Sequence, residues 1–373
     1  MSLLTVSIVQ RRLTHYRVPL FEALRRSLAD ADITLRVLHG EGNPREMEKN
    51  DSGHLGWSES LDTKYLAGNR LCWQPFARQV SGSALVIVTQ ENAMLANHLA
   101  LVQRPAPRLA FWGHGANLQG NSSSLRETYK RWSTRQVDWY FAYTGLSVDT
   151  VERSGFPRDR ITQLNNAIDL RELQDDLAAA EGTNLRKFRA SLGLGEGPVG
   201  LFLGSLYTHK RLDFLLSAAE KVRGKVDGFQ LLIVGDGPQR DLVERASFQY
   251  PWIRYTGALK GIDKAKALNL ATISMNPGLV GLGILDSFAA GVPMITTDCG
   301  LHSPEIAYLS PENGVITPDD LDSYVDACTR VLTDKPELDR LACGCRAAVE
   351  VYTLPNMVEN FSKGVIKALE VAR

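Results

Sequence analysis

Short apolar runs alternate with amphipathic stretches almost from the start of the chain. Residues 4–9 form a continuous apolar run typical of a buried strand, whereas residues 18–28 place their apolar side chains at helical spacing. The alternation continues through the first half, with further strands expected at residues 33–38, 84–88, 108–112, 139–143 and 161–164. This order predicts a parallel sheet covered by helices. Residues 40–79 have weak periodicity and are expected to form an irregular or partly helical insertion.

A second series of the same kind follows the turn-rich segment 193–198, which we interpret as a linker. Strands are expected at 199–203, 230–234, 253–256, 273–275 and 293–296, and helices at 212–222, 240–246, 265–270 and 284–290. The pattern predicts an α/β fold of two Rossmann-like doubly wound domains that face each other across a cleft. We assign residues 1–190 to the first domain and 191–350 to the second. A last helix within residues 351–373 either belongs to the second domain or crosses back onto the first.

Composition excludes several classes of protein. With 44% hydrophobic and 23% charged residues, the chain has the balance of a globular protein, and it lacks the apolar run of about eighteen residues that a membrane-spanning helix needs. The opening apolar run is too short for a signal peptide, so we expect a cytoplasmic protein. Five scattered cysteines predict reduced thiols, and Cys343 and Cys345 have no second pair to complete a metal site.

The net charge of zero conceals an asymmetry. Residues 1–160 carry 20 basic against 15 acidic side chains, and the remainder carries 22 against 27. A weakly basic first half suits an anionic partner, and an uneven solvated surface would give the same count.

Residues 276–293 combine a strand end, a glycine-rich turn and a helix start. Free amides at the start of a helix attract anions, so we expect the turn Gly281-Leu282-Gly283 to hold a diphosphate. Its two glycines let the backbone approach such a ligand closely. Asp286, on the first turn of the following helix, is expected to accept hydrogen bonds from sugar hydroxyls. A helix cap with packing glycines is the alternative interpretation.

A polar, cationic turn follows the first strand of the second series. It begins with Gly204 and Ser205 and ends with Lys210 and Arg211. In doubly wound sheets the carboxyl ends of the strands face the ligand. We therefore expect Lys210, helped by Arg211, to offset the charge of a leaving nucleoside diphosphate, the alternative being a solvated pair of surface cations.

Other strand ends add weaker signals. The turn Gly235-Asp236-Gly237 lacks the third glycine of a dinucleotide fingerprint, so the sequence does not favour an NAD site, and Gly257 ends a strand whose backbone groups could contact a nucleobase. The D-x-D sequence Asp30-Ala31-Asp32 lies between a helix and a strand, on the wrong side of the sheet for a nucleotide-bound metal. We expect neither metal nor cofactor. The sequence has no P-loop, G-x-S-x-G or H-E-x-x-H motif.

Two segments of the first half are expected at the same edge of its sheet. Arg11, Arg12 and His15 lie in the loop expected after the first strand, and His114 stands between two glycines at the end of a later strand. A histidine in that setting is more often functional than one on an apolar face. His114 is therefore the stronger candidate, and ordinary polar packing is the alternative for His15.

The motifs of the second half, in their order and spacing, resemble those of the family-four retaining glycosyltransferases, which have the GT-B fold. The segments that carry the resemblance are 204–206, 233–238, 281–293, 303–306 and 313–314, with weaker support from 4–17 and 166–169. The resemblance implies a retaining, metal-independent transfer of sugar from a nucleoside-diphosphate sugar to a glycan or lipid-linked acceptor, as in synthesis of cell-surface polysaccharide or lipopolysaccharide. It also implies that the first domain binds the acceptor, with Arg11 and Arg12 on that side, and that the second binds the donor.

The resemblance also implies roles for single residues. Lys210 and the amides near Gly281 and Gly283 would stabilise the departing diphosphate, and His114 would contact the donor sugar. Inverting chemistry would instead need a base near the acceptor hydroxyl, and His15 is the residue to test.

Two positions depart from the family pattern. Gly278 stands where the family has a glutamate, and Ser205 where it has an arginine. These departures indicate a different sugar or a reshaped subsite, or a relative that binds nucleotide sugars without catalysis. A sugar-nucleotide epimerase or hydrolase on the same fold is a further alternative.

One expected helix carries both basic and aromatic side chains. This combination predicts peripheral contact with the inner face of an anionic membrane, and a solvated helix is the alternative. The residues are Arg126, Tyr129, Lys130, Arg131, Trp132 and Arg135. We expect no nucleic acid partner. The sequence leaves open the donor base and sugar, the linkage, the acceptor and the oligomeric state.

Overall fold

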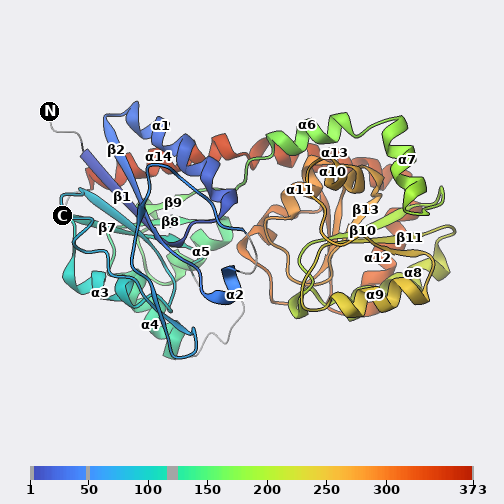
Figure 1. Cartoon of the computed structure of the whole chain (residues 1–373), viewed down its shortest axis with the longest axis horizontal. Coiled ribbons are helices and arrows are strands. Elements are labelled where there is room, and N and C mark those ends of the chain that lie inside the picture. The colour runs from blue at the N-terminus through green and yellow to red at the C-terminus, as the bar shows by residue number, and fades with distance from the viewer. Residues whose placement is uncertain (1–3, 48–50, 116–124, 372–373) are drawn as a thin grey trace. The chain divides into compact units, whose positions relative to one another are not determined.

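The computed structural model describes residues 4–47, 51–115 and 125–371, which form two α/β units (Figure 1). Unit 1 consists of residues 1–169 and 353–373, and unit 2 of residues 170–352. The first division therefore lies about twenty residues before the boundary expected at 190/191. The reason is packing, because α6 (Arg171–Ala179) and α7 (Thr183–Ser191) lie against α10 (Gly261–Leu270) of unit 2.

The sheet of unit 1 is parallel throughout, with strand order β3-β2-β1-β6-β7-β8-β9. Its central strand β6 is buried at every residue, as expected for a parallel sheet with helices on both faces. The strands are β1 (Leu4–Arg12), β2 (Ile33–Gly40), β3 (Glu59–Ser60), β6 (Leu85–Thr89), β7 (Arg108–Gly113), β8 (Trp139–Ala142) and β9 (Ile161–Gln163). The helices are α1 (Val18–Ala29), α3 (Leu95–Gln103), α4 (Leu125–Thr134), α5 (Gly145–Arg153) and α14 (Leu354–Glu370).

The insertion at residues 40–79 is largely irregular with a little helix, as the sequence suggested. Its described part has one short helix, α2 (Pro44–Met47), and an antiparallel pair, β4 (Lys64–Leu66) and β5 (Leu71–Trp73). The edge strand β3 follows β2 in parallel, and Arg36 on β2 holds Glu59 on β3 at 2.7 Å. The insertion thus extends the edge of the sheet.

Unit 2 has a parallel sheet of order β12-β11-β10-β13-β14-β15. The chain winds one way from β10 and the other way from β13, so the topological switch point lies between these two strands. The strands are β10 (Val199–Leu203), β11 (Gln230–Val234), β12 (Ile253–Tyr255), β13 (Ile273–Met275), β14 (Met294–Thr297) and β15 (Gly314–Thr317). The remaining helices are α8 (Leu212–Lys225), α9 (Arg240–Gln249), α11 (Ile284–Ala289), α12 (Leu321–Thr333) and α13 (Lys335–Val351). The two doubly wound sheets predicted from the sequence are confirmed.

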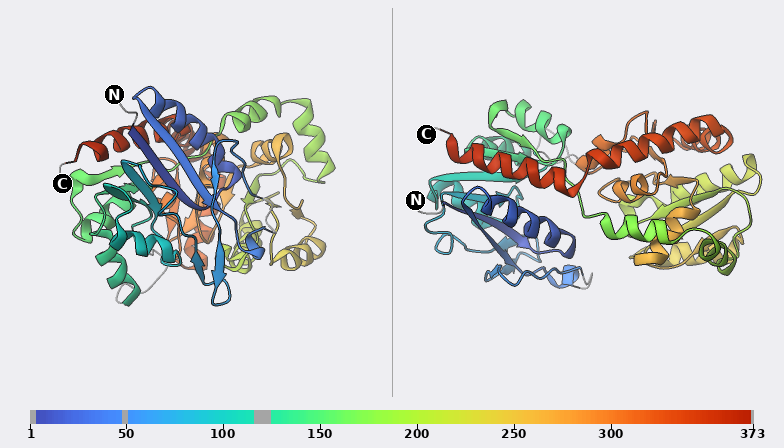
Figure 2. Two further views of the ribbon diagram at one scale, coloured as in Figure 1. Left: turned by 60° about the vertical axis from the view of Figure 1, so that its left-hand side comes forward. Right: turned by 90° about the horizontal axis from the view of Figure 1, so that it is seen from above.

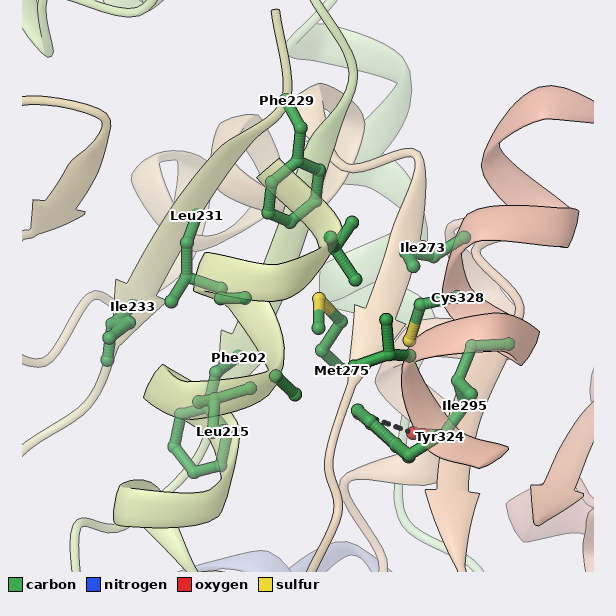
Figure 3. Packing of buried hydrophobic residues seen from close by; sticks show 14 of the residues in the cluster. Phe202, Leu215, Phe229, Leu231, Ile233, Ile273, Met275, Ile295, Tyr324 and Cys328 are labelled. Carbon is green, nitrogen blue, oxygen red and sulfur yellow. Dashed lines mark hydrogen bonds between the residues drawn. The ribbon is translucent and has the colours of Figure 1, made fainter. Parts of the chain in front are cut away.

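The core of unit 2 joins β10, β11 and β13 to the helices α8 and α12 (Figure 3). Tyr324 is fully buried there, and its hydroxyl donates to the carbonyl of Ile295 at 3.2 Å, so the polar group is not left unpaired. Gly200 keeps β10 close to its neighbours, because a Cβ at this position would lie 2.5 Å from Met275 Sδ. This packing fixes the strand ends that carry the candidate site.

The C-terminal helix α14 belongs to unit 1, where it lies beside α1 (Figure 2). Its Phe361 stacks on Phe141 of β8 with ring centroids 4.6 Å apart and meets Trp112 of β7 at 5.1 Å. Gly364 permits this approach, since a Cβ there would lie 2.5 Å from Thr162 Oγ1. The last helix therefore crosses back onto the first unit, which is one of the two placements that the sequence left open. No helix in the described residues is long and apolar enough to span a membrane.

We expect Phe361→Ala to destabilise unit 1 by about 3–5 kcal/mol, because it removes a fully buried ring that contacts two strands. Urea unfolding, with amide hydrogen exchange of β7 and β8 to identify the unit affected, measures the effect. Lys367→Ala, at an exposed position of the same helix, is the control and should change the stability by less than about 0.5 kcal/mol. Equal effects of the two changes would contradict this account of α14.

Candidate functional site

The segments that follow β10 and β13 meet at the switch point of unit 2. The amide of Leu279 donates to the carbonyl of His209 at 2.8 Å. In the reverse direction, Lys210 Nζ donates to the carbonyl of Leu279 at 2.5 Å. The lysine predicted from the sequence is thus held at the edge where doubly wound sheets bind their ligands.

Gly278 makes this close approach possible. A Cβ at residue 278 would fall against the carbonyl oxygen of His209 and within 2.7 Å of Lys210 Cα. A glutamate, which the resembling family has at this position, does not fit while the two segments stay together. The close packing of the two segments therefore explains the glycine at residue 278.

Lys210 is a buried cation, 9% exposed. It forms no ion pair with any residue that the structure describes, and its hydrogen bond goes to a neutral carbonyl. Burial lowers the pKa of the Lys210 ammonium to about 8, and nearby Cys299 opposes this fall only in part. A buried ammonium without an anion is unfavourable, so this position favours an anionic ligand.

The glycines of the turn Gly281-Leu282-Gly283 have more open surroundings than Gly278. Neither of its glycines has a positive φ, and a Cβ at Gly283 would meet no atom within 4 Å. At Gly281 the nearest atom is Ser303 Oγ at 3.5 Å. The amides of the three residues have no acceptor within the described parts of the chain. Contacts within the protein therefore do not explain these glycines, and the space beside them is open for a ligand.

Asp286 on α11 is buried rather than open. Its Oδ1 lies 2.9 Å from Lys264 Nζ of α10, and the side chain is 12% exposed. Burial raises the pKa of Asp286, and the charge of Lys264 acts against that rise. The sequence predicted a carboxylate directed at sugar hydroxyls; the structure gives it a half-buried cation, Lys264, as partner.

Arg211 was predicted to help offset a diphosphate, and the structure gives it other partners. Its guanidinium pairs with Asp319, donates to Thr297 Oγ1 at 3.0 Å and lies 4.5 Å from the ring of Phe214. Its charge is thus already neutralised. Arg211 connects the strand ends of unit 2, whereas Lys210 has no ion-pair partner among the described residues.

The other donor-side candidates hold loops together. Gly204 donates its amide to Val234 at 3.0 Å, and the carbonyl of Gly257 accepts from Gly235 at 2.9 Å. A Cβ at Gly235 would collide with the carbonyl of Gly204. Ser205 is exposed beside them.

Arg11 and Arg12 were expected in a loop facing the acceptor. They form the end of β1 instead, and carboxylates neutralise both. Arg11 Nη1 lies 2.6 Å from Glu46 and Arg11 Nε lies 3.1 Å from Glu91, while both terminal nitrogens of Arg12 bind Asp51 at 2.6 and 2.9 Å. Neither arginine is free to bind an anionic acceptor in this structure.

His15 and His114 both lie at the carboxyl edge of the unit 1 sheet, and both are exposed. His15 Nδ1 lies 3.2 Å from the carbonyl of Asp51, and the ring of His114 lies 4.6 Å from the ring of Tyr143. Between the two histidines the structure reveals Arg17, a residue that the sequence reasoning missed. The feature of the sequence that could have indicated Arg17 is its place as a basic residue directly between a strand-end loop and a helix.

His302 is a second missed residue. Its Nδ1 accepts from the amide of Val280 at 3.1 Å, so Nε2 carries the proton and donates to the carbonyl of Thr297 at 2.7 Å. The ring thereby fixes the start of the glycine-rich turn. No motif in the sequence links residues 280 and 302.

The predicted basic and aromatic helix face is α4. Tyr129, Arg131 and Trp132 are exposed, and Trp132 retains 48% of its surface. Arg135, just beyond the helix, donates to the carbonyl of Ser154 at 2.7 Å. The side chains of Arg126 and Lys130 lie outside the described residues.

Comparison with known proteins places a family match in unit 2. Residues 197–334 match the family model described as Glycosyl transferases group 1. The 2-deoxystreptamine N-acetyl-D-glucosaminyltransferase of Niallia circulans is 27% identical over 165 residues, 42% of each chain. The GDP-mannose-dependent alpha-(1-6)-phosphatidylinositol monomannoside mannosyltransferase of Mycobacterium tuberculosis is 28% identical over 162 residues, 40% of this chain and 42% of the relative. The chain thus spans about two fifths of the length of the curated relatives it matches.

Solved structures share the fold over nearly the whole chain. A glycosyltransferase from Rickettsia africae has a TM-score of 0.71 at 15% identity, with 100% of both chains covered. HepE from Anabaena, solved in complex with UDP, has a TM-score of 0.68 at 12% identity, with 97% of this chain and 99% of the other covered. These likenesses show the GT-B fold, as the sequence predicted.

The two kinds of glycine in unit 2 should respond differently to an added methyl group. We expect Gly278→Ala to cost about 1–3 kcal/mol of stability, because its Cβ would push against the backbone of residues 209 and 210. Gly283→Ala, where the space is open and φ is −60°, should change stability by less than about 0.5 kcal/mol. Thermal unfolding of both variants measures the difference. If Gly278→Ala is as stable as Gly283→Ala, the close approach at the switch point is wrong.

Proposed function

We propose that this chain is a glycosyltransferase that moves a sugar from a nucleoside-diphosphate sugar, bound by unit 2, to a glycan or lipid-linked acceptor. The observation that carries the proposal is Lys210, a buried ammonium at the switch point that has no carboxylate partner among the described residues. The match of residues 197–334 to Glycosyl transferases group 1 supports the reaction class, as do the transferase names of the relatives.

The chemistry of sugar transfer explains why such a cation is useful. When the bond between the anomeric carbon and the diphosphate breaks, negative charge grows on the leaving oxygen. Donors that are already in place stabilise this charge without reorganisation. Lys210 Nζ is fixed by the carbonyl of Leu279 before any ligand arrives, and the amides of residues 281–283 have no competing acceptor in the described chain.

In its finer form, the proposal is a retaining transfer without a metal ion. Lys210 and the free amides would supply the charge stabilisation that a divalent cation supplies in other transferases. His114 would contact the donor sugar, and His15 is the base to test if the reaction inverts. Gly278, in place of a glutamate, would leave the sugar subsite with one carboxylate fewer than in the resembling family.

We place the acceptor at a membrane surface, in cell-surface polysaccharide or lipopolysaccharide synthesis. The support is the exposed part of α4, where Trp132 and Tyr129 stand beside Arg131. Amphipathic helices with aromatic and basic side chains bind anionic bilayers in this way.

The first test is turnover. With UDP-, GDP- and other activated sugars and candidate acceptors, Lys210→Ala should lower kcat/KM about 10²–10³-fold, because the leaving diphosphate loses its preorganised cation. Lys221→Ala is the control, since that lysine is exposed and pairs with Asp322 on the surface. Unchanged kinetics in Lys210→Ala would remove this lysine from the mechanism. Turnover of the nucleotide sugar without any acceptor would favour the epimerase or hydrolase, and nucleotide-sugar binding without turnover would favour the non-catalytic relative.

The second test is the pH dependence of nucleotide binding. A bound diphosphate favours the protonated lysine, so binding must take up a proton once the pH exceeds the free pKa of about 8. The dissociation constant of UDP should therefore rise up to about tenfold per pH unit above pH 8 and be flat below it. Calorimetry between pH 7 and 9.5 measures the profile. Lys210→Met should bind weakly with no break near pH 8, and a break retained in that variant would show that another group titrates.

A further inference from the structure

Arg17 is a buried cation at the carboxyl edge of the unit 1 sheet. It ends the single turn His15–Arg17 that follows β1, and it is 7% exposed. Its guanidinium carbon lies 5.3 Å from the ring of Tyr16, 5.1 Å from that of Trp112 and 5.8 Å from that of Tyr143. Three aromatic rings thus surround the charge.

The guanidinium forms no ion pair with any residue that the structure describes. Among the described residues no side chain or carbonyl accepts a hydrogen bond from the guanidinium of Arg17, and its Nη1 is buried without a partner. The indole Nε1 of Trp112, next to it, is buried and unpaired as well. Arg11 and Arg12, on the strand that leads to the same edge, are both neutralised by carboxylates. Arg17 is the exception in this part of the sheet.

Cation–π attraction accounts for only part of this arrangement. A cation over aromatic rings gains about 0.5–2 kcal/mol, but ring faces are poor acceptors for the five N–H groups of a guanidinium. Arginine also cannot lose its proton in a protein, so Arg17 keeps its charge although it is buried. A site with two unpaired donors and a fixed positive charge suits a carboxylate or a phosphate.

A second Arg–Trp pair in unit 1 shows what a purely structural contact looks like. Arg25 lies 4.5 Å from the ring of Trp57 at the surface, and Trp57 Nε1 donates to Glu22 at 2.9 Å. There the indole N–H has an acceptor and the cation is exposed. Neither is true of Arg17 and Trp112.

The position of Arg17 relates it to the acceptor side of the proposed reaction. The ring of Tyr16 lies 6.0 Å from that of His15, and the ring of Tyr143 lies 4.6 Å from that of His114, so the guanidinium stands among the rings that join the two candidate histidines. We propose that Arg17 and Trp112 form an anion subsite in unit 1 that binds a carboxylate or phosphate group of the acceptor. The assignment to the acceptor rests on the proposed function.

The test is a binding measurement on the full chain, saturated with UDP so that added anions do not occupy the donor site. The probes are sodium glucuronate, inorganic phosphate and, as a neutral control, glucose. The indole N–H signal of Trp112, assigned by a Trp112→Phe change, is followed by ¹⁵N NMR. We expect a saturable shift with one or both anions and none with glucose. Glucuronate alone would identify a carboxylate, and phosphate alone a phosphorylated acceptor.

Matched variants decide whether the shift reports Arg17. Arg17→Gln should abolish it, and Arg17→Lys, which keeps the charge without the planar fork, should weaken binding about tenfold or more. Arg25→Gln should leave it unchanged. If Arg17→Gln does not fold, the wild type and Arg17→Lys still give the answer. The absence of a shift with either anion, or an equal shift in the folded Arg17 variants, overturns the subsite.

Failure of this inference is distinguishable from failure of the proposed function. The shift should persist in Lys210→Ala, whose change lies in the other unit. A shift without sugar transfer would remove the transferase and the acceptor assignment but leave the anion site. Sugar transfer without a shift would remove the subsite alone.

Discussion

The close approach of two backbone segments in unit 2 is the constraint on which the candidate site depends. Residue 278 has no side chain, so the segment after β13 lies directly against the turn after β10, and the hydrogen bonds between Leu279 and residues 209 and 210 follow from that contact. The contact buries Lys210, and burial lowers the pKa of its ammonium. The glycine at residue 278, a departure from the motif pattern, thus leads to the lowered pKa of Lys210.

Both units place a buried cation, without an anionic partner in the described chain, at the carboxyl edge of a parallel sheet, and the two cations behave differently. Lys210 can release its proton near pH 8 and so tolerates an empty site. Arg17 stays charged and is stabilised by aromatic rings instead. Under the two proposals, the first cation would hold the leaving diphosphate and the second a charged group of the acceptor.

The sequence predicted the strands well because a doubly wound parallel sheet produces continuous apolar runs, and β11 and β13 have the expected bounds. It predicted Lys210 and the turn 281–283 from their place at strand ends. It did not foresee the environments of Arg11 or Asp286. Glu91, a partner of Arg11, lies far along the chain, and Lys264, the partner of Asp286, belongs to no motif. Nor can a sequence distinguish a glycine that packs, such as Gly278, from one beside open space, such as Gly283. The unit boundary was misplaced because α6 and α7 pack onto α10 through contacts without a local signature.

The charge distribution of unit 2 supports an anionic ligand whichever sugar it carries. Asp286 is bound to Lys264 and Asp319 to Arg211, so these carboxylates and cations cancel in pairs. Lys210 has no such carboxylate partner within the described parts of the chain. Because residue 278 is a glycine, the two segments lie together and residue 278 contributes no carboxylate to offset the charge of Lys210, so the positive potential stays available to a ligand. Under the proposed function, the glycine at residue 278 takes a carboxylate from the sugar subsite and leaves the charge of Lys210 for the diphosphate, which argues for altered specificity rather than lost binding.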